Sequence, residues 1–216
     1  MKTISALSLF VLLSITSKAQ SKSSDEDNSN GRKSQFGVLA GYNWSYITGE
    51  KAGFNSNTKN GYMAGVYFTP SSAGVVGYKT QIVYSRQGYT FDNDGMNTEV
   101  MNDYIYLPQF TTITIAKRFQ LQAGAQIGFL LNAKKTSDNK DSSIANLMNR
   151  LDYGFAGGIE VNPIQHFIIG GRYNLGLGKL YKHYQESTSN PYPLPFNPET
   201  TNFKNAVVQF YLGYRF

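Results

Sequence analysis

The sequence contains no cysteine and only two histidines among its 216 residues. Without cysteine, the chain has no disulfide framework, no thiolate metal ligand and no thiol nucleophile. Charged residues make up 16% of the chain, and its basic residues are scattered rather than interleaved with aromatic side chains in one patch. The pattern expected of a nucleic-acid-binding surface is therefore missing, although the formal net charge is +6.

A long hydrophobic run is also missing, so no membrane-spanning helix is predicted. The most apolar segment, residues 4–15, follows Lys2 and precedes small residues that end at Ala19, as in a secretory signal peptide. A membrane-anchor helix is the alternative, but the run falls short of the roughly 20 residues that a span needs. Residues 1–19 are therefore predicted to be a signal peptide. Residues 20–34 contain no apolar side chain and are predicted to be a disordered leader.

Cleavage of this signal peptide should leave Gln20 or Ser21 as the first residue of the mature protein. The cut is expected there because the small residues that define a cleavage site end at Ala19. Intact-mass spectrometry of protein from the membrane fraction should show the shortened chain. A mature protein that still carries residues 1–19 would contradict this interpretation.

Glycine and aromatic residues are abundant, with 21 Gly, 16 Tyr and 14 Phe. These residues favour turns and β-structure over helices. The mean hydropathy is negative, which argues against a bundle of helices in lipid. It does not argue against a membrane barrel, in which only every second strand residue faces lipid and the connections are polar.

The final segment, residues 205–216, has one continuous apolar face and one mostly polar face at the two-residue period of a strand. The chain ends on an aromatic residue. This arrangement resembles the C-terminal strand that the barrel-assembly machinery reads in Gram-negative outer-membrane barrels, and an edge strand of a soluble β-protein is the alternative. The residues of the predicted assembly signal are Phe210, Leu212, Tyr214 and Phe216.

The same alternation recurs along the chain and predicts eight strands. They span residues 36–46, 62–68, 76–84, 104–116, 119–131, 152–161, 167–177 and 205–216. The phase of the fourth strand is left open, because Ile105, Leu107 and their partners compete with Tyr104 and Tyr106 for the apolar face. Pro108 would normally argue against a strand, and a local bulge is predicted to accommodate it.

The connections between these strands alternate in length. Short turns join strands two and three, four and five, and six and seven, whereas residues 48–61, 87–103, 133–151 and 178–204 form long polar connections. This alternation is typical of outer-membrane barrels, with short periplasmic turns, long extracellular loops and both termini in the periplasm. Residues 35–216 are thus predicted to form an all-β, eight-stranded, antiparallel, up-and-down transmembrane barrel. A lipocalin-like soluble barrel is the alternative, but its core would then hold several costly charges.

The predicted inner face carries charges of both signs: Lys79, Asp152, Glu160 and Arg172. An eight-stranded barrel has room only for side chains inside, so these residues are predicted to form a polar plug together with glutamines. With a turn centred near Pro163, Arg172 would lie opposite Ala156. A loose set of solvated side chains is the alternative.

No catalytic, metal or cofactor site is predicted, and the chain is predicted not to be an enzyme. His183 is followed by Ser187 and Ser189, but in a proline-rich connection where no rigid element would orient a His–Ser pair. His183 and Glu186 supply too few ligands for a closed metal site. Residues 92–95 resemble the start of a calcium loop but lack its remaining ligands, so a turn is predicted there.

Six short motifs occur in order along the predicted barrel. They are G-Y-M-A-G-V-Y-F at 61–68, Q-I-V-Y-S-R-Q-G at 81–88, Y-I-Y-L-P at 104–108, L-Q-A-G-A-Q-I-G at 121–128, G-G-R-Y-N-L-G-L at 170–177 and the closing Y-L-G-Y-R-F. Together they resemble the PorT-like family of outer-membrane β-barrels over residues 36–216. The resemblance implies an integral outer-membrane barrel, and the namesake of the family is tied to type IX secretion and gliding machinery.

The predicted function is that of a small integral outer-membrane barrel with a structural or surface-interaction role and a side-chain-filled lumen. The alternatives are a component of a secretion apparatus and a narrow channel for small solutes. The predicted partners are outer-membrane lipid, the barrel-assembly machinery during biogenesis, and a protein or glycan bound by the extracellular loops. No cofactor and no nucleic acid are expected.

Overall fold

The computed structural model describes residues 32–49, 56–93, 96–116, 118–137, 140–182 and 202–216. The predicted signal peptide and nearly all of the predicted leader lie outside these residues. The described structure begins before the predicted barrel boundary, and the backbone of Arg32 bridges to that of Ser72. Among the described residues, no helix is long and apolar enough to cross a membrane.

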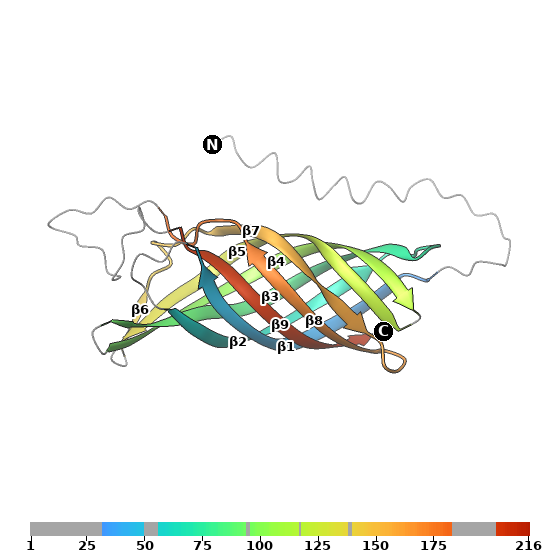
Figure 1. The fold of residues 1–216 in the computed structure, drawn as a ribbon, viewed down its shortest axis with the longest axis horizontal. Helices are drawn as coiled ribbons and strands as arrows, with labels where there is room; N and C mark the ends of the chain where they lie inside the picture. The colour runs from blue at the N-terminus through green and yellow to red at the C-terminus, as the bar shows by residue number, and fades with distance from the viewer. Residues whose placement is uncertain (1–31, 50–55, 94–95, 117, 138–139, 183–201) are drawn as a thin grey trace, which may run out of the picture. The chain divides into compact units, whose positions relative to one another are not determined.

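Nine antiparallel strands make up the described structure. They are β1 (Gln35–Thr48), β2 (Ser56–Thr69), β3 (Val76–Asn93), β4 (Met96–Ala116), β5 (Phe119–Ser137), β6 (Lys140–Ser143), β7 (Leu151–Val161), β8 (Phe167–Gly176) and β9 (Lys204–Arg215). The sheet runs β4-β3-β2-β1-β9-β8-β7-β5, and β4 also pairs with β5. This last pairing closes a ring of eight strands, with the first strand beside the last (Figure 1), and β6 is a short addition to β5. The predicted eight-stranded, up-and-down barrel is therefore confirmed.

Side chains alternate between an exposed outer face and a buried inner face, as predicted. The exposed outer face is apolar and includes Phe36, Val66, Ile82, Leu121, Phe155, Ile169 and Leu212. Inside the ring, the buried side chains include amides, hydroxyls and charges. A polar interior with an apolar exterior is the reverse of a soluble barrel, so the lipocalin-like alternative is wrong.

The structure settles the phase of β4. Tyr104, Tyr106 and Phe110 point inward, while Ile113 and Ile115 are exposed on the outer face. The Tyr106 ring fits inside the barrel because Gly128 lies opposite it and has no side chain. A Cβ added to Gly128 would lie only 2.4 Å from the ring. Pro108 pairs with Gln126 without a register shift, so the predicted bulge at Pro108 is wrong. The irregularities of the β4–β5 pairing lie instead at Asp103/Tyr104 and Thr114/Ala116.

Strands extend into three of the predicted long connections. β3 and β4 continue to Asn93 and from Met96, so the predicted connection 87–103 shrinks to a tight hairpin. Likewise β5 continues to Ser137, and β2 already begins at Ser56. In this extension the polarity reverses: Tyr89, Phe91 and Val100 point inward and are buried. The direction of the side chains does not change, since odd-numbered residues of β3 point inward from Lys79 to Phe91. Only the polarity of the two faces is exchanged, so the hydrophobic pattern of the earlier part of the strand does not continue into the extension.

Candidate functional site

The lumen of the barrel is filled in successive layers, and the first lies toward the end with the short turns. Lys79 on β3 and Glu160 on β7 form an ion pair, with their side chains only 4% and 1% exposed. The Tyr211 hydroxyl donates to Glu160 Oε1 at 2.8 Å and accepts from Gln122 Nε2 at 2.6 Å. Every charged oxygen of Glu160 therefore has a partner, which a buried ion pair needs to be tolerated.

Arg172 on β8 forms the middle layer. Its Nε donates to Gln209 Oε1 at 2.6 Å and its Nη1 to Gln81 Oε1 at 2.7 Å. The guanidinium carbon lies 5.5 Å from the ring centroid of Phe110 and 5.3 Å from that of Tyr211. The positive charge is thus held by neutral amides and aromatic faces rather than by a carboxylate.

The register around Arg172 differs from the predicted one. Arg172 lies opposite Gly158, and Ala156 lies opposite Asn174. The β7–β8 turn extends through His166, which has a φ of 75°, so its centre falls beyond Pro163. The predicted pairing was therefore wrong by two residues.

Asp152 belongs to a third layer, apart from the ion pair of Lys79 and Glu160. Its Oδ2 accepts a hydrogen bond of 2.6 Å from the Tyr106 hydroxyl, which also approaches Gln87. The structure therefore brings Lys79 and Glu160 together, surrounds Arg172 with glutamines and leaves Asp152 with a tyrosine. Between the second and third layers, a cavity of about 10 Å³ has room for roughly one water molecule.

An apolar layer that the sequence did not reveal closes the lumen toward the other end. Its buried members come from the strand extensions and from two connections, and they are Tyr89, Phe91, Tyr104, Ile144, Met148, Leu180, Tyr181 and Phe203. The two connections are held together by a bridge between Met148 and Tyr181. The Asn149 amide donates to the carbonyl oxygens of Lys179 and Tyr181, at 2.7 and 3.0 Å. Among the described residues, side chains therefore fill the lumen from the ion pair of Lys79 and Glu160 to this apolar layer.

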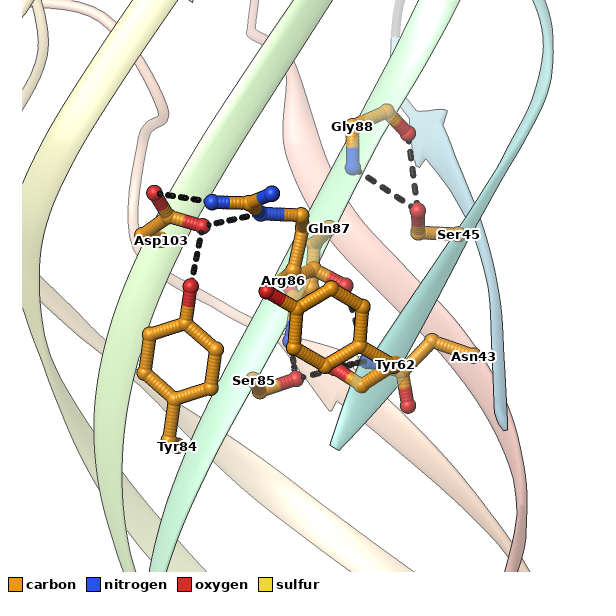
Figure 2. Close-up of polar contacts among 9 residues, drawn as sticks. All are labelled: Asn43, Ser45, Tyr62, Tyr84, Ser85, Arg86, Gln87, Gly88 and Asp103. Carbon is orange, nitrogen blue, oxygen red and sulfur yellow. Dashed lines mark hydrogen bonds and ion pairs between the residues drawn. The ribbon is translucent and has the colours of Figure 1, made fainter. Parts of the chain in front are cut away.

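The pairing of β2 with β3 is interrupted, and side chains of β1 fill the interruption (Figure 2). The Asn43 amide nitrogen lies 3.0 Å from Tyr62 O, 2.8 Å from Arg86 O and 2.9 Å from Ser85 Oγ. Nearby, the Ser45 hydroxyl accepts from the Gly88 amide at 2.8 Å. Backbone groups in a membrane segment have no water to bond with, so these two side chains replace the missing strand pairing.

Replacing Asn43 with alanine should therefore lower the free energy of unfolding by about 1–3 kcal/mol, because buried carbonyls lose their donor. Urea unfolding of purified protein in micelles, followed by fluorescence of Trp44 and by heat-dependent gel mobility, measures the change. Asn60→Ala is the matched control, since the exposed Asn60 lies on β2 beside the same interruption. Equal stability of the two variants would contradict the proposed role of Asn43.

On the outer face at this level, Arg86 and Asp103 form an ion pair whose side chains are 34% and 11% exposed (Figure 2). Arg86 Nε donates to Asp103 Oδ1 at 2.7 Å, and Nη2 donates to Oδ2 at 3.1 Å. The Tyr84 hydroxyl also donates to Asp103, and the Tyr62 ring lies under the guanidinium. This pair spans β3 and β4 between the irregularities of two neighbouring pairings. No sequence pattern predicts this ion pair, because Asp103 lies in a segment that was predicted to be a loop.

The four residues of the predicted assembly signal, Phe210, Leu212, Tyr214 and Phe216, all face outward and are 40–68% exposed. β9 pairs with both β1 and β8, so it is the strand that joins the two ends of the chain in the ring. Phe216 stacks on Phe36 with 5.8 Å between ring centroids, and Phe210 meets Trp44 at 5.2 Å. The last strand is therefore joined to the first by aromatic contacts as well as by backbone pairing.

The remaining candidate residues give no catalytic or metal arrangement that can be described. His183, Glu186, Ser187 and Ser189 lie outside the described residues, as does the centre of the hairpin at 92–95. The His166 ring donates a hydrogen bond from Nδ1 to Arg215 O and stacks on Tyr214. Within the described ranges, no group of three His, Cys, Asp or Glu side chains could hold a metal ion.

Comparisons with known proteins agree with this architecture. The family model described as "Outer membrane protein beta-barrel domain" matches residues 18–182. The attachment invasion locus protein Ail of Yersinia pestis is 18% identical, with a TM-score of 0.50 over 86% of this chain and 100% of Ail. Neisserial surface protein A is 13% identical, with a TM-score of 0.52 over 86% and 100% of the two chains. No curated protein matches the chain. At these identities, the solved structures show a common fold only.

Proposed function

Because the chain belongs to the outer-membrane β-barrel domain family, we propose that it is an integral outer-membrane protein with a sealed lumen that acts through its projecting strands. The observation that carries this proposal is the filling of the lumen. Among the described residues, the ion pair of Lys79 and Glu160, the amides around Arg172 and the apolar layer that includes Met148 and Tyr181 occupy the lumen one after another. A narrow channel is therefore disfavoured, and a structural or surface-interaction role is favoured.

The position of the membrane follows from the outer face. On β1, the segment from Phe36 to Tyr46 rises about 25 Å at a strand tilt of about 40°. Aromatic side chains gather at both limits, with Phe36, Phe167 and Phe216 at one and Trp44 and Tyr62 at the other. An apolar band of about this height between aromatic girdles is typical of outer-membrane barrels. Short turns face the periplasm in that class, so both ends of the barrel domain are proposed to lie there.

The surface proposed to interact with partners is the projecting sheet, which we define as β6 with the neighbouring ends of β3, β4 and β5. Among the described strands, β6 pairs with β5 alone, so in this part of the structure its other edge has no strand partner. Its residues, from Lys140 to Ser143, are all exposed. An exposed polar edge can bind an extended segment of another protein by strand addition. A protein partner outside the cell is therefore favoured over a role in lipid alone.

The PorT-like motifs support a second candidate, in which the barrel is a component of a secretion apparatus. In that case the partner is a protein of the cell's own envelope, and contacts at the periplasmic turns are expected too. The two candidates predict different cross-linking patterns.

Site-specific photocrosslinking in intact cells tests the proposal. A benzophenone side chain is placed at Lys134 or Ser142 on the projecting sheet, and at Ile82, which is 52% exposed on the lipid-facing wall. Discrete protein adducts at the projecting sheet but not at Ile82 are expected. Adducts only at a periplasmic turn residue such as Ser71 would favour the secretion role. The absence of adducts at both projecting positions would contradict the surface-interaction proposal.

A further inference from the structure

A basic pocket opens at the short-turn end of the barrel, on the inner side of the ring. It has a volume of about 70 Å³, and its lining includes Arg32, Lys79, Gln120, Glu160 and Arg215. The volume is enough for one small polar group with attendant water, and too small for a whole sugar or peptide. Lys79 and Glu160 are both part of the lining, so their ion pair closes the pocket toward the interior of the barrel.

The charges around this pocket are not balanced. Lys79 is neutralised by Glu160, but neither Arg32 nor Arg215 has a carboxylate within ion-pair distance among the described side chains. Four other acidic side chains are described, and all lie farther toward the opposite end: Glu99, Asp103, Asp141 and Asp152. The pocket therefore carries two guanidinium charges that the described protein leaves unpaired.

Arg32 is held firmly at the rim of the pocket. Its guanidinium donates to the Thr114 hydroxyl and to the carbonyl oxygens of Gly74 and Val75, the last two at 2.9 and 3.3 Å. These acceptors are neutral, so they fix the orientation of the guanidinium without cancelling its charge. A positive group placed in advance in this way loses little entropy when it binds an anion.

Two further groups point to an occupant. Arg215 lies inward on β9, opposite Gly37, where an added Cβ would meet the Tyr67 ring at 2.5 Å. Tyr67 is 1% exposed, and its hydroxyl has no hydrogen-bond partner in the described structure. A buried hydroxyl without a partner is costly unless water or a ligand completes its bonding. The Tyr67 ring packs against Lys79, with 5.1 Å from Nζ to the ring centroid, so Tyr67 lies next to a residue of the pocket lining without lining the pocket itself.

We propose that this pocket binds the oxyanion group, a carboxylate or a phosphate, of a small soluble molecule of the periplasm. Arg215 supplies the principal charge, Arg32 the second, and Gln120 a neutral hydrogen-bonding group. Planar guanidinium groups match both carboxylate and phosphate oxygens in paired hydrogen bonds. Lipid headgroups are disfavoured, because they surround the outer wall while the pocket lies within the ring.

The test is a titration of purified full-length mature protein in a non-ionic maltoside micelle. Inorganic phosphate and, separately, succinate are added at constant ionic strength, and the arginine Nε–H signals are followed by nuclear magnetic resonance. A saturable shift of the Arg215 signal with at least one anion is expected. Saturation by phosphate alone assigns a phosphate group, saturation by succinate alone assigns a carboxylate, and saturation by both assigns a general oxyanion site.

Variants separate this site from general attraction to a basic surface. Arg215→Ala should weaken binding at least tenfold, measured by calorimetry, whereas Arg215→Lys should keep part of the affinity. Arg118→Ala is the matched control, since Arg118 is exposed at the same end but does not line the pocket. Heat-dependent gel mobility verifies that each variant is folded. The proposal would be overturned if the Arg215 signal shifted linearly with phosphate and succinate, as it does with chloride. Equal affinity of Arg215→Ala and the unmodified protein would overturn it too.

Discussion

Replacing both Tyr214 and Phe216 with serine is expected to remove most of the folded, heat-modifiable protein from the outer membrane, while synthesis and export continue. β9 is the strand that pairs with β1 to join the two ends of the chain. Phe216 stacks on Phe36, and Tyr214 packs edge-on against both Phe216 and Phe167. Without these aromatic contacts, the end of β9 is held to β1 and β8 mainly by backbone pairing. A ring left open in lipid exposes backbone groups that cost several kcal/mol each.

The matched control removes a comparable aromatic area elsewhere on the same wall. Tyr153 and Phe155 on β7 are 50% and 59% exposed and also face outward, so both are replaced with serine. Gel mobility of unheated outer-membrane samples measures the folded fraction of each variant. If the terminal strand is an assembly signal, the control keeps most of its folded protein. An equal loss in both variants would show that only lipid-facing apolar area matters, and unchanged levels would contradict the assembly role altogether.

Glu160→Gln is expected to have the largest effect of any single substitution in the lumen, lowering the free energy of unfolding by about 3–5 kcal/mol. Glutamine keeps an acceptor for Tyr211 but leaves the Lys79 ammonium buried without its counter-charge. Removing one partner of a buried ion pair costs more than the pair itself contributes. Urea unfolding in micelles measures the change.

The double variant Lys79→Met/Glu160→Gln also removes the unpaired Lys79 ammonium, so it should regain most of the lost stability. Lys134→Met is the surface control, because Lys134 and Asp141 are 51% and 60% exposed and 3.7 Å apart. An exposed pair contributes at most about 1 kcal/mol. A double variant as unstable as Glu160→Gln would mean that the charge balance of the lumen is not what stabilises it.

The two-residue alternation was enough to predict the ring, because each membrane strand has an apolar outer face and a polar inner face. It also identified Lys79, Glu160 and Arg172 as inner residues, all of which are buried. The alternation failed to predict the extension of β3, where the inward residues, Tyr89 and Phe91, are apolar and the outward residues are polar. Within one strand, the apolar residues switch from the outward to the inward positions. A prediction that expects them at the outward positions throughout therefore assigns this part of the strand to a loop.

The contacts inside the ring were harder to predict than its faces. Which inner groups meet depends on the stagger of strands far apart in sequence, and a turn through His166 moved Arg172 by two positions relative to β7. The role of Asn43 depends on an interruption between β2 and β3 that no local pattern reveals. Tertiary register, rather than local preference, decides such contacts.

Conductance across planar lipid bilayers shows whether the lumen is sealed. Eight strands leave an interior that side chains fill, whereas an aqueous pore needs a wider ring. The unmodified protein is therefore expected to show no steady porin-sized current. Arg172→Ala should open small, flickering currents, because Gln81 and Gln209 lose the group that links them. A large and stable conductance from the unmodified protein would contradict the sealed lumen and favour a transporter.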